Sequence, residues 1–411
     1  MRNIDPSTGG AATAPDPAPV PPPEPAAIRR MLSSDGFRAS VTFIAFLALF
    51  AVYAVWLGDS FMTTDGRLLD VHQNAPVLLL GLAVLVTLIA GQFDLSVASM
   101  ATLTTFLAIG LKVNQDWPFL LVIVACLGIG VIGGLLNGFL VVRLRVNTFI
   151  ATLATGGIFL GLSSVYSKGT QLSPTEGDPP IPGWFSGPDS LGAFGNKVPS
   201  VVAWIVIALL VLWAFTAVRS RRPERFAEGA WAGIAAGIVA VATAVLLVVG
   251  AGGFVEGMSW TILLLLVVGL GLWTLITQMT YGRHLHATGA NPEAARLAGV
   301  RTERVTVQAF VIGGVLAALA GIVLAANQGS ASPDVAAGYL LPAFAAAFLS
   351  TVVLSSGRFT VPGTIIGGTF LVWVSQGLIV GGLEFTWNEV VNGVVLAVAV
   401  AFSTVFRKDG R

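Results

Sequence analysis

The sequence predicts an all-α integral membrane protein, a polytopic helical bundle of about 12 transmembrane helices (10–12) with both termini in the cytoplasm. Of its 411 residues, 55% are hydrophobic and 10% are charged. Soluble proteins carry roughly 25% charged residues, so this chain cannot cover a water-facing surface of its size. Apolar segments recur along the chain, and the positive charges between them fall mostly on one side of the predicted membrane.

Twelve segments approach the length of about 20 mostly apolar residues that a helix needs to cross the bilayer. Several are short and rich in glycine, so one or two of them could be re-entrant. The segments are residues 40–58, 75–91, 94–111, 118–142, 147–166, 198–218, 230–252, 258–280, 305–326, 339–355, 360–381 and 387–405.

The positive charges fix the predicted orientation. With the N-terminus inside and strict alternation, the inner segments hold 18 arginines and lysines, and the outer segments hold four: Arg67, Lys112, Lys168 and Lys197. Cytoplasmic loops are enriched in these residues. An odd number of crossings would place the basic groups at 219–225 or 407–411 outside, so an even number is predicted.

The chain divides into three parts. Residues 1–38 are rich in proline and alanine and lack the apolar core of a secretory signal, which predicts a disordered cytoplasmic tail. Residues 39–406 form the transmembrane domain, and residues 407–411 form a short cytoplasmic tail. A long outer loop at 167–199 either presents a surface to an external partner or acts as a spacer over the outer mouth.

Composition excludes several functions. The net charge of +1 argues against a nucleic-acid-binding surface. One cysteine and three histidines leave no cluster for a metal site or for catalysis, so no catalytic or metal-binding residue is predicted. No phosphate-binding Gly-x-x-x-x-Gly-Lys-Ser/Thr loop occurs. The chain is therefore expected to hold no cofactor, and any ATP would be bound by another subunit.

One glycine motif resembles a nucleotide fingerprint but is better explained by helix packing. Gly128, Gly130 and Gly133 form a Gly-x-Gly-x-x-Gly pattern inside an apolar helix, with no preceding strand. Gly130, Gly134 and Gly138 are spaced four apart, which allows two helix backbones to approach closely in lipid. We therefore predict a helix–helix contact here.

The first candidate functional stretch is Gly91–Ser99, between two apolar segments. Asp94 is the acid that the span map places at a membrane segment without a basic neighbour in sequence, and a carboxylate at that depth usually faces a cavity or a partner. It lines the substrate path or, alternatively, caps the first turn of the following helix. Gln92, Ser96 and Ser99 extend a polar stripe suited to a hydroxyl-rich solute.

The second candidate stretch is an inner loop that predicts a short helix at 291–299. Asn291 suits the N-cap, Pro292 the first helical position, and Glu293 the positive helix start. Gly299 ends the helix. A capped helix of two turns among arginines predicts a rigid cytoplasmic protrusion with small side chains, which would fit a groove on a partner.

These stretches carry a family resemblance. The sequence resembles the inner-membrane permease subunits of bacterial sugar ABC importers of the ribose/xylose/arabinose type. Gly91–Ser99 is similar to the family's Gly-x-x-Asp-Leu-Ser-Val-Gly-Ser signature, with Ala98 replacing a glycine. Residues 137–153 resemble its Asn-Gly…Phe-Ile-Val-Thr-Leu block, and residues 281–299 resemble its Phe-Gly-Arg…Asn-x-Glu-Ala-Ala-Arg-Leu block. The helix near 230–252 and the outer stretch 169–175 resemble the longer xylose-type branch.

The resemblance implies roles for particular residues. The block at 281–299 contains the coupling helix that docks on the ATPase, and the implied coupling residues are Gly289, Asn291, Pro292, Glu293, Ala294, Ala295, Arg296, Leu297 and Gly299. Asn137 and Thr152 join Gln92, Asp94, Ser96 and Ser99 on the tentative substrate path. One block departs from the family pattern: residues 350–357 lack three of four expected glycines, which leaves the transported sugar and the gating geometry open.

The implied function is import of a monosaccharide, a pentose such as xylose, across the bacterial inner membrane. Two copies of the permease would form the pore in the lipid, a periplasmic sugar-binding protein would deliver the solute, and a cytoplasmic ABC ATPase would supply energy. The alternative is a secondary transporter driven by protons or sodium, which usually places ionisable groups near the bilayer midplane. Asp94 is the candidate for such a group.

Overall fold

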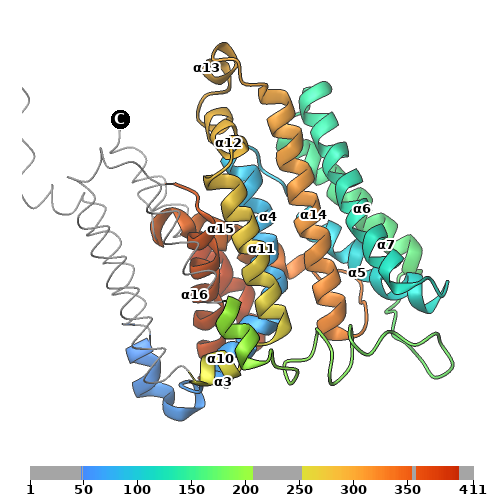
Figure 1. The fold of residues 1–411 in the computed structure, drawn as a ribbon, viewed down its shortest axis with the longest axis vertical. Coiled ribbons are helices and arrows are strands. Elements are labelled where there is room, and N and C mark those ends of the chain that lie inside the picture. Colours follow the sequence, from blue (N-terminus) through green and yellow to red (C-terminus); the bar gives the residue numbers. More distant parts are fainter. Residues whose placement is uncertain (1–47, 49, 207–251, 354–357, 398–411) are drawn as a thin grey trace, which may run out of the picture.

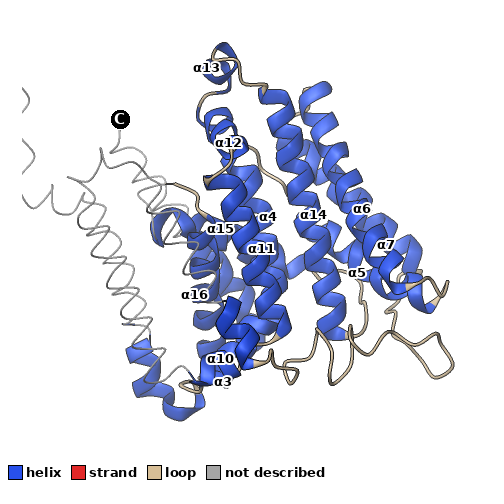
Figure 2. Ribbon diagram, viewed as in Figure 1, coloured by secondary structure: helices blue, strands red, loops and turns tan. Residues whose placement is uncertain are grey.

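The computed structural model describes residues 48, 50–206, 252–353 and 358–397. Across those ranges the regular secondary structure is helical, with two isolated β-bridges, Leu172–Ala331 and Lys197–Ser259, and no strand (Figure 2). The predicted all-α class is confirmed. Five of the described helices are long and apolar enough to cross a membrane, or six if one bent pair counts as a single span.

The described helices have the following bounds. They are α3 (Thr64–Gln73), α4 (Ala75–Ile89), α5 (Val97–Val113), α6 (Phe119–Gly138), α7 (Thr148–Ser167), α10 (Gly252–Glu256), α11 (Trp260–Thr277), α12 (Thr280–Ala290), α13 (Pro292–Leu297), α14 (Thr302–Gln328), α15 (Leu340–Val353) and α16 (Val361–Val380). A π-helical turn, Phe139–Arg143, extends α6, and 3₁₀ turns lie at Gly58–Ser60, Ala337–Tyr339 and Phe385–Trp387. Residues 50–57, 200–206 and 388–397 are also helical.

Eight predicted spans coincide within a few residues with α4, α5, α6, α7, α11, α14, α15 and α16. The other four, at 40–58, 198–218, 230–252 and 387–405, lie wholly or partly outside the described residues, as do both predicted tails. The number twelve and the cytoplasmic placement of the termini therefore stay predictions. The structure adds three helices to the sequence-based map: α3, the short α10 and α12.

Several helices begin at side chains that satisfy their free first-turn N–H groups. Asn147 accepts from the Phe149 amide at the start of α7 (3.0 Å), Ser259 accepts from Ile262 at α11 (3.4 Å), and Thr360 accepts from Gly363 at α16 (3.3 Å). Such caps fix where a helix starts because the first four N–H groups lack partners within the helix. These boundaries are therefore set by local sequence.

Two helices form the centre of the bundle. Every residue of α4 is buried, and 78% of the most apolar window of α14 is buried, against 33% for α6 and for α7. A helix that is apolar on all sides belongs in the interior, while one with an exposed apolar face suits lipid. In Figure 1, α4 and α14 lie between the pair α6/α7 and the pair α15/α16.

Helices α3 and α4 pass the length test as a span only together, and they meet at an angle of 54°. At one end of the molecule α13 protrudes beyond α12, and at the opposite end lie α3, α10 and the loop that follows α7 (Figure 1). Four predicted inner arginines among the described residues lie at the α13 end, where Arg145 and Arg296 line one cavity and Arg283 and Arg358 line another.

The glycine motif of α6 packs against α14, as predicted. A Cβ added at Gly130 would lie 2.5 Å from the Gly314 carbonyl oxygen, and one at Gly134 would lie 2.4 Å from the Phe310 carbonyl oxygen. Both distances are well inside ordinary contact at about 3.5–4.0 Å. The two backbones therefore touch directly, and the pattern serves helix packing.

Candidate functional site

The predicted substrate-path residues meet at the break between α4 and α5. The chain turns there through residues 90–96, with Gly91 in the left-handed region at φ +76°. The Gly91 amide donates to the Leu88 carbonyl (3.0 Å) and the Gln92 amide to the Thr87 carbonyl (2.9 Å). This pair of bonds closes a helix C-terminus around a glycine, so the turn is firmly tied to the last turn of α4.

Asp94 is the anchor of this turn and is only 1% exposed. Its Oδ1 accepts from the Ser96 amide (2.9 Å) and from the Ser96 hydroxyl (2.6 Å). Ser96 is itself the N-cap residue of α5, and no side chain bonds the amides of that helix's first turn. Asp94 therefore satisfies a free N–H at the start of α5 through the N-cap residue Ser96, and its place on the substrate path stays a prediction.

A chain of buried hydrogen bonds connects the turn at residues 90–96, which we call the Asp94 turn, to two further helices. Asn137 of α6 donates from Nδ2 to the Ser96 hydroxyl (2.8 Å), and Thr155 of α7 donates to Asn137 Oδ1 (2.5 Å). We call Asp94, Ser96, Asn137 and Thr155 the Asp94 network. Buried polar groups that all find partners rigidify a site, so the network holds the α4–α5 break against α6 and α7.

The other predicted path residues lie around the network. Gln92 Oε1 accepts from the Thr148 hydroxyl, and the Thr152 hydroxyl donates to the Phe93 carbonyl (3.4 Å) as well as to Thr148 (2.9 Å). Ser99 faces α7, because its hydroxyl lies 3.4 Å from where a Cβ of Gly156 would stand. The structure thus brings all six residues together around the buried Asp94.

The predicted helix at 291–299 is present as α13. Asn291 Oδ1 accepts from the amides of Glu293 (3.1 Å) and Ala294 (3.0 Å), and Pro292 occupies the first turn. Gly299, at φ +85°, ends the segment. Leu297 is 91% exposed, although it is a large apolar residue. The protrusion therefore offers an apolar tip held by a capped helix.

Two cavities lie beside the turn at residues 90–96 on this side of the molecule, and the first of them also borders α13. One, of about 420 Å³, is lined by Gln92 of the turn and by Pro292 and Arg296 of α13. The other, of about 1110 Å³, is lined by Gly91, Phe93, Trp273 and Arg283 among others. The turn lies between them, so its residues are within reach of movements of α12 and α13.

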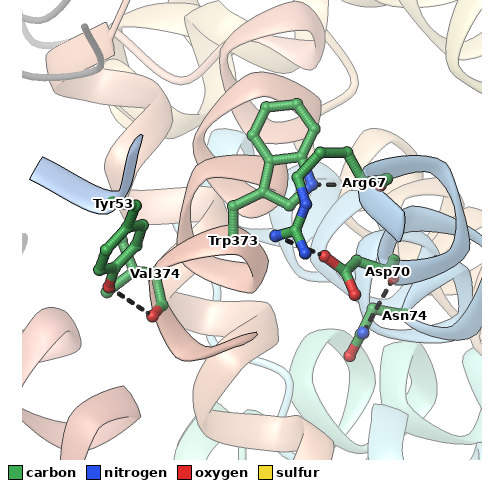
Figure 3. Close-up of polar contacts among 6 residues, drawn as sticks. All are labelled: Tyr53, Arg67, Asp70, Asn74, Trp373 and Val374. Carbon is green, nitrogen blue, oxygen red and sulfur yellow. Dashed lines mark hydrogen bonds and ion pairs between the residues drawn. The ribbon is translucent and has the colours of Figure 1, made fainter. Parts of the chain in front are cut away.

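A second buried polar group, which the sequence did not predict, lies at the opposite end of the molecule. Arg67 and Asp70 of α3 form an ion pair (Nη1–Oδ2 2.8 Å; Figure 3). The guanidinium lies 3.6 Å from the centre of the Phe61 ring. Trp373 of α16 donates from its indole to the Arg67 carbonyl (3.2 Å). In the sequence, the sign of this ion pair was that Arg67 and Asp70 are three residues apart, a spacing at which side chains on one helix can meet. The Trp373 hydrogen bond ties α3 to α16.

His72 continues this polar group toward the outer loop. Its Nδ1 lies 2.8 Å from the Ser259 hydroxyl, and its Nε2 lies 2.9 Å from the Gly192 carbonyl oxygen. The histidine therefore ties α3 to α11 and to the loop after α7. Within the described ranges, no group of three or more His, Cys, Asp or Glu side chains could hold a metal ion.

Comparison with known proteins assigns the family. A family described as branched-chain amino acid transport system / permease component matches residues 71–221 and 231–400. The chain belongs to this permease family. The permease is 30% identical over 382 residues to the xylose transport system permease protein XylH of Escherichia coli strain K12, covering 90% of this chain and 94% of that protein. No solved structure matches it significantly.

Other relatives agree with this assignment. The permease is 25% identical to the ribose import permease protein RbsC of Escherichia coli strain K12 (90% of this chain, 95% of that protein). It is 27% identical to the autoinducer 2 import system permease protein LsrC of Salmonella typhi (91% and 86%). These relatives are transport components, not enzymes. The permease is thus a multi-pass membrane component of a sugar ABC importer, as the sequence motifs indicated.

Proposed function

We propose that this permease carries a pentose, such as xylose, from a periplasmic binding protein into the cytoplasm across the bacterial inner membrane. The observation that carries the proposal is the capped α13 protrusion on a chain whose relatives are named for xylose and ribose transport. Two copies in lipid form the pore, with twelve crossings each and both termini inside. The domain limits at 39–406 and the tails follow from that topology.

In this proposal α13 docks in a groove of a cytoplasmic ABC ATPase, which binds the ATP that the permease itself does not bind. The exposed Leu297 side chain supplies the apolar contact, and Glu293 and Arg296 supply polar contacts around it. The remaining coupling residues shape the protrusion rather than contact nucleotide; they are Gly289, Asn291, Pro292, Ala294, Ala295 and Gly299.

In this proposal, the six residues around the α4–α5 break close the path until the break opens. Asp94, Ser96 and Asn137 satisfy one another's hydrogen bonds, so a sugar hydroxyl can replace those bonds only after the break opens. Gln92, Ser99 and Thr152 lie beside them. This arrangement supports a gate whose polar groups meet the solute transiently, while selection of the sugar takes place in the binding protein.

The proposal is tested by reconstitution in liposomes with the ATPase and the binding protein. Uptake of radiolabelled xylose, ribose and arabinose is measured with and without internal or external ATP and with and without an ion gradient. ATP-dependent uptake of one pentose that requires the binding protein is expected. Accumulation driven by a proton or sodium gradient without the ATPase would overturn the proposal in favour of a secondary transporter.

A further inference from the structure

The end of α12 rests directly on the backbone of α4. Gly289 lies in the last turn of α12, and a Cβ added there would stand 1.9 Å from the Ile89 carbonyl oxygen and 3.1 Å from the Ala90 carbonyl carbon. No side chain fits in that space, because ordinary carbon contacts begin at about 3.5 Å. The contact therefore joins two main chains without any flexible side chain between them.

The other side of this contact is the closed end of α4. Gly91 follows Ile89 by two residues, and a Cβ added to it would stand 3.4 Å from the Gly289 Cα. The amides of Gly91 and Gln92 are bonded back into α4, so the turn moves with the helix end. Gly289 thus touches both the last turn of α4 and the glycine that begins the turn.

The contact lies between the two predicted functional segments. On one side, a single residue, Asn291, separates α12 from α13. On the other, Asp94 follows Gly91 by three residues and belongs to the network that reaches α6 and α7. Gly289 is therefore the direct steric connection between the protrusion and the α4–α5 break.

We propose that Gly289 is a positioning residue for coupling: its missing side chain seats α12 on the Ile89 carbonyl, so that displacement of α13 moves the Asp94 turn. This rests on the proposed function, because it requires that an ATPase displace α13. A contact between two hydrogen-bonded backbones transmits compression well, since packed elements shift as units rather than deform. A longer side chain at either glycine would separate the two elements and disturb that transmission.

The first test compares Gly289→Ala with Gly271→Ala. Gly271 lies on α11 and has no atom within 4 Å of an added Cβ, so both changes add one methyl group to a helix and only Gly289 meets an obstruction. Each variant is reconstituted with the ATPase and the binding protein. For Gly289→Ala, we expect ATP hydrolysis to persist while the sugar moved per ATP falls about tenfold; Gly271→Ala should match the unchanged protein.

A second pair guards against a failure of Gly289→Ala to fold. Gly91 and Gly382 both end a helix in the left-handed region, at φ +76° and +95°, with the same pair of backward hydrogen bonds. Asparagine tolerates that conformation. Gly91→Asn places a side chain against Gly289, whereas an added Cβ at Gly382 meets nothing within 4 Å. Loss of sugar moved per ATP in Gly91→Asn alone is expected.

A failure of the proposed function and a failure of the coupling role of Gly289 give different results. If the unchanged permease does not take up a pentose with ATP, the proposed function is wrong, whatever the variants do. If it does, and both Gly289→Ala and Gly91→Asn keep the sugar moved per ATP within twofold of their controls, the coupling role of Gly289 is wrong. Parallel loss of ATP hydrolysis, thermal stability and uptake in both variants would also overturn it, because that pattern indicates a purely structural contact.

Discussion

Replacing Gly134 by alanine gives a direct test of how α6 and α14 pack. The added Cβ would lie 2.4 Å from the Phe310 carbonyl oxygen and 2.5 Å from the Val311 Cα. To restore ordinary contact, the two backbones must separate by about 1 Å. Gly128→Ala on the same helix is the control, because its added Cβ meets nothing within 4 Å.

The expected difference in stability follows from comparing Gly134→Ala with Gly128→Ala. Forcing an extra methyl group into a packed interface costs about 1–3 kcal/mol, while replacing glycine by alanine within a helix gains about 1 kcal/mol. The gain applies to both variants, so it cancels between them. Gly134→Ala should therefore be less stable than Gly128→Ala by the overpacking cost itself, about 1–3 kcal/mol.

The free energy of unfolding is measured by titrating the purified variants in mixed micelles with a denaturing detergent and following helix content by circular dichroism. Equal stability of the two variants, within about 0.5 kcal/mol, would contradict the direct backbone contact. A loss of stability in Gly128→Ala comparable to that in Gly134→Ala would contradict it as well, because that position has room for the methyl group.

Three further predictions concern charged groups. Asp94→Ala should lower uptake and also the melting temperature, since each buried donor left unpaired costs about 1–3 kcal/mol; full uptake with lowered stability alone would remove Asp94 from the path. Asp70→Asn should destabilise the protein by about 3–5 kcal/mol, because it leaves Arg67 buried without its ion-pair partner, whereas exposed Asp65→Asn on the same helix should cost at most about 1 kcal/mol; similar melting temperatures for the two would count against the buried pair. Glu293→Ala should uncouple ATP hydrolysis from uptake in a folded protein, and normal uptake would argue against docking at α13.

The membrane spans could be predicted because their signal is local. Each run of apolar residues must find lipid or a packed interior, and this requirement does not depend on which helix becomes the neighbour. The start of α13 was predictable for a similar reason, since Asn291 bonds amides two and three residues along the same chain. Asn147 and Thr360 set the starts of α7 and α16 in the same local way.

Helices α3 and α12 were harder to predict. Arg67 and Asp70 look like surface charges in sequence, and only the packing of Phe61 and Trp373 around them makes their burial tolerable. Similarly, α12 looked like part of an inner loop because its sequence is polar. Its position depends on the contact of Gly289 with the Ile89 carbonyl, a neighbour 200 residues away in sequence.

By itself, then, the sequence determined that this protein lies in lipid, that it is helical and where most of its spans fall. Its motifs also place it in a permease family. The tertiary structure decided how Asp94 reaches Asn137 and Thr155, and what Gly289 touches. The physical reason is that hydrophobicity and capping act over one or two turns of chain. Hydrogen bonds and steric contacts between helices depend on distances that only the folded arrangement fixes.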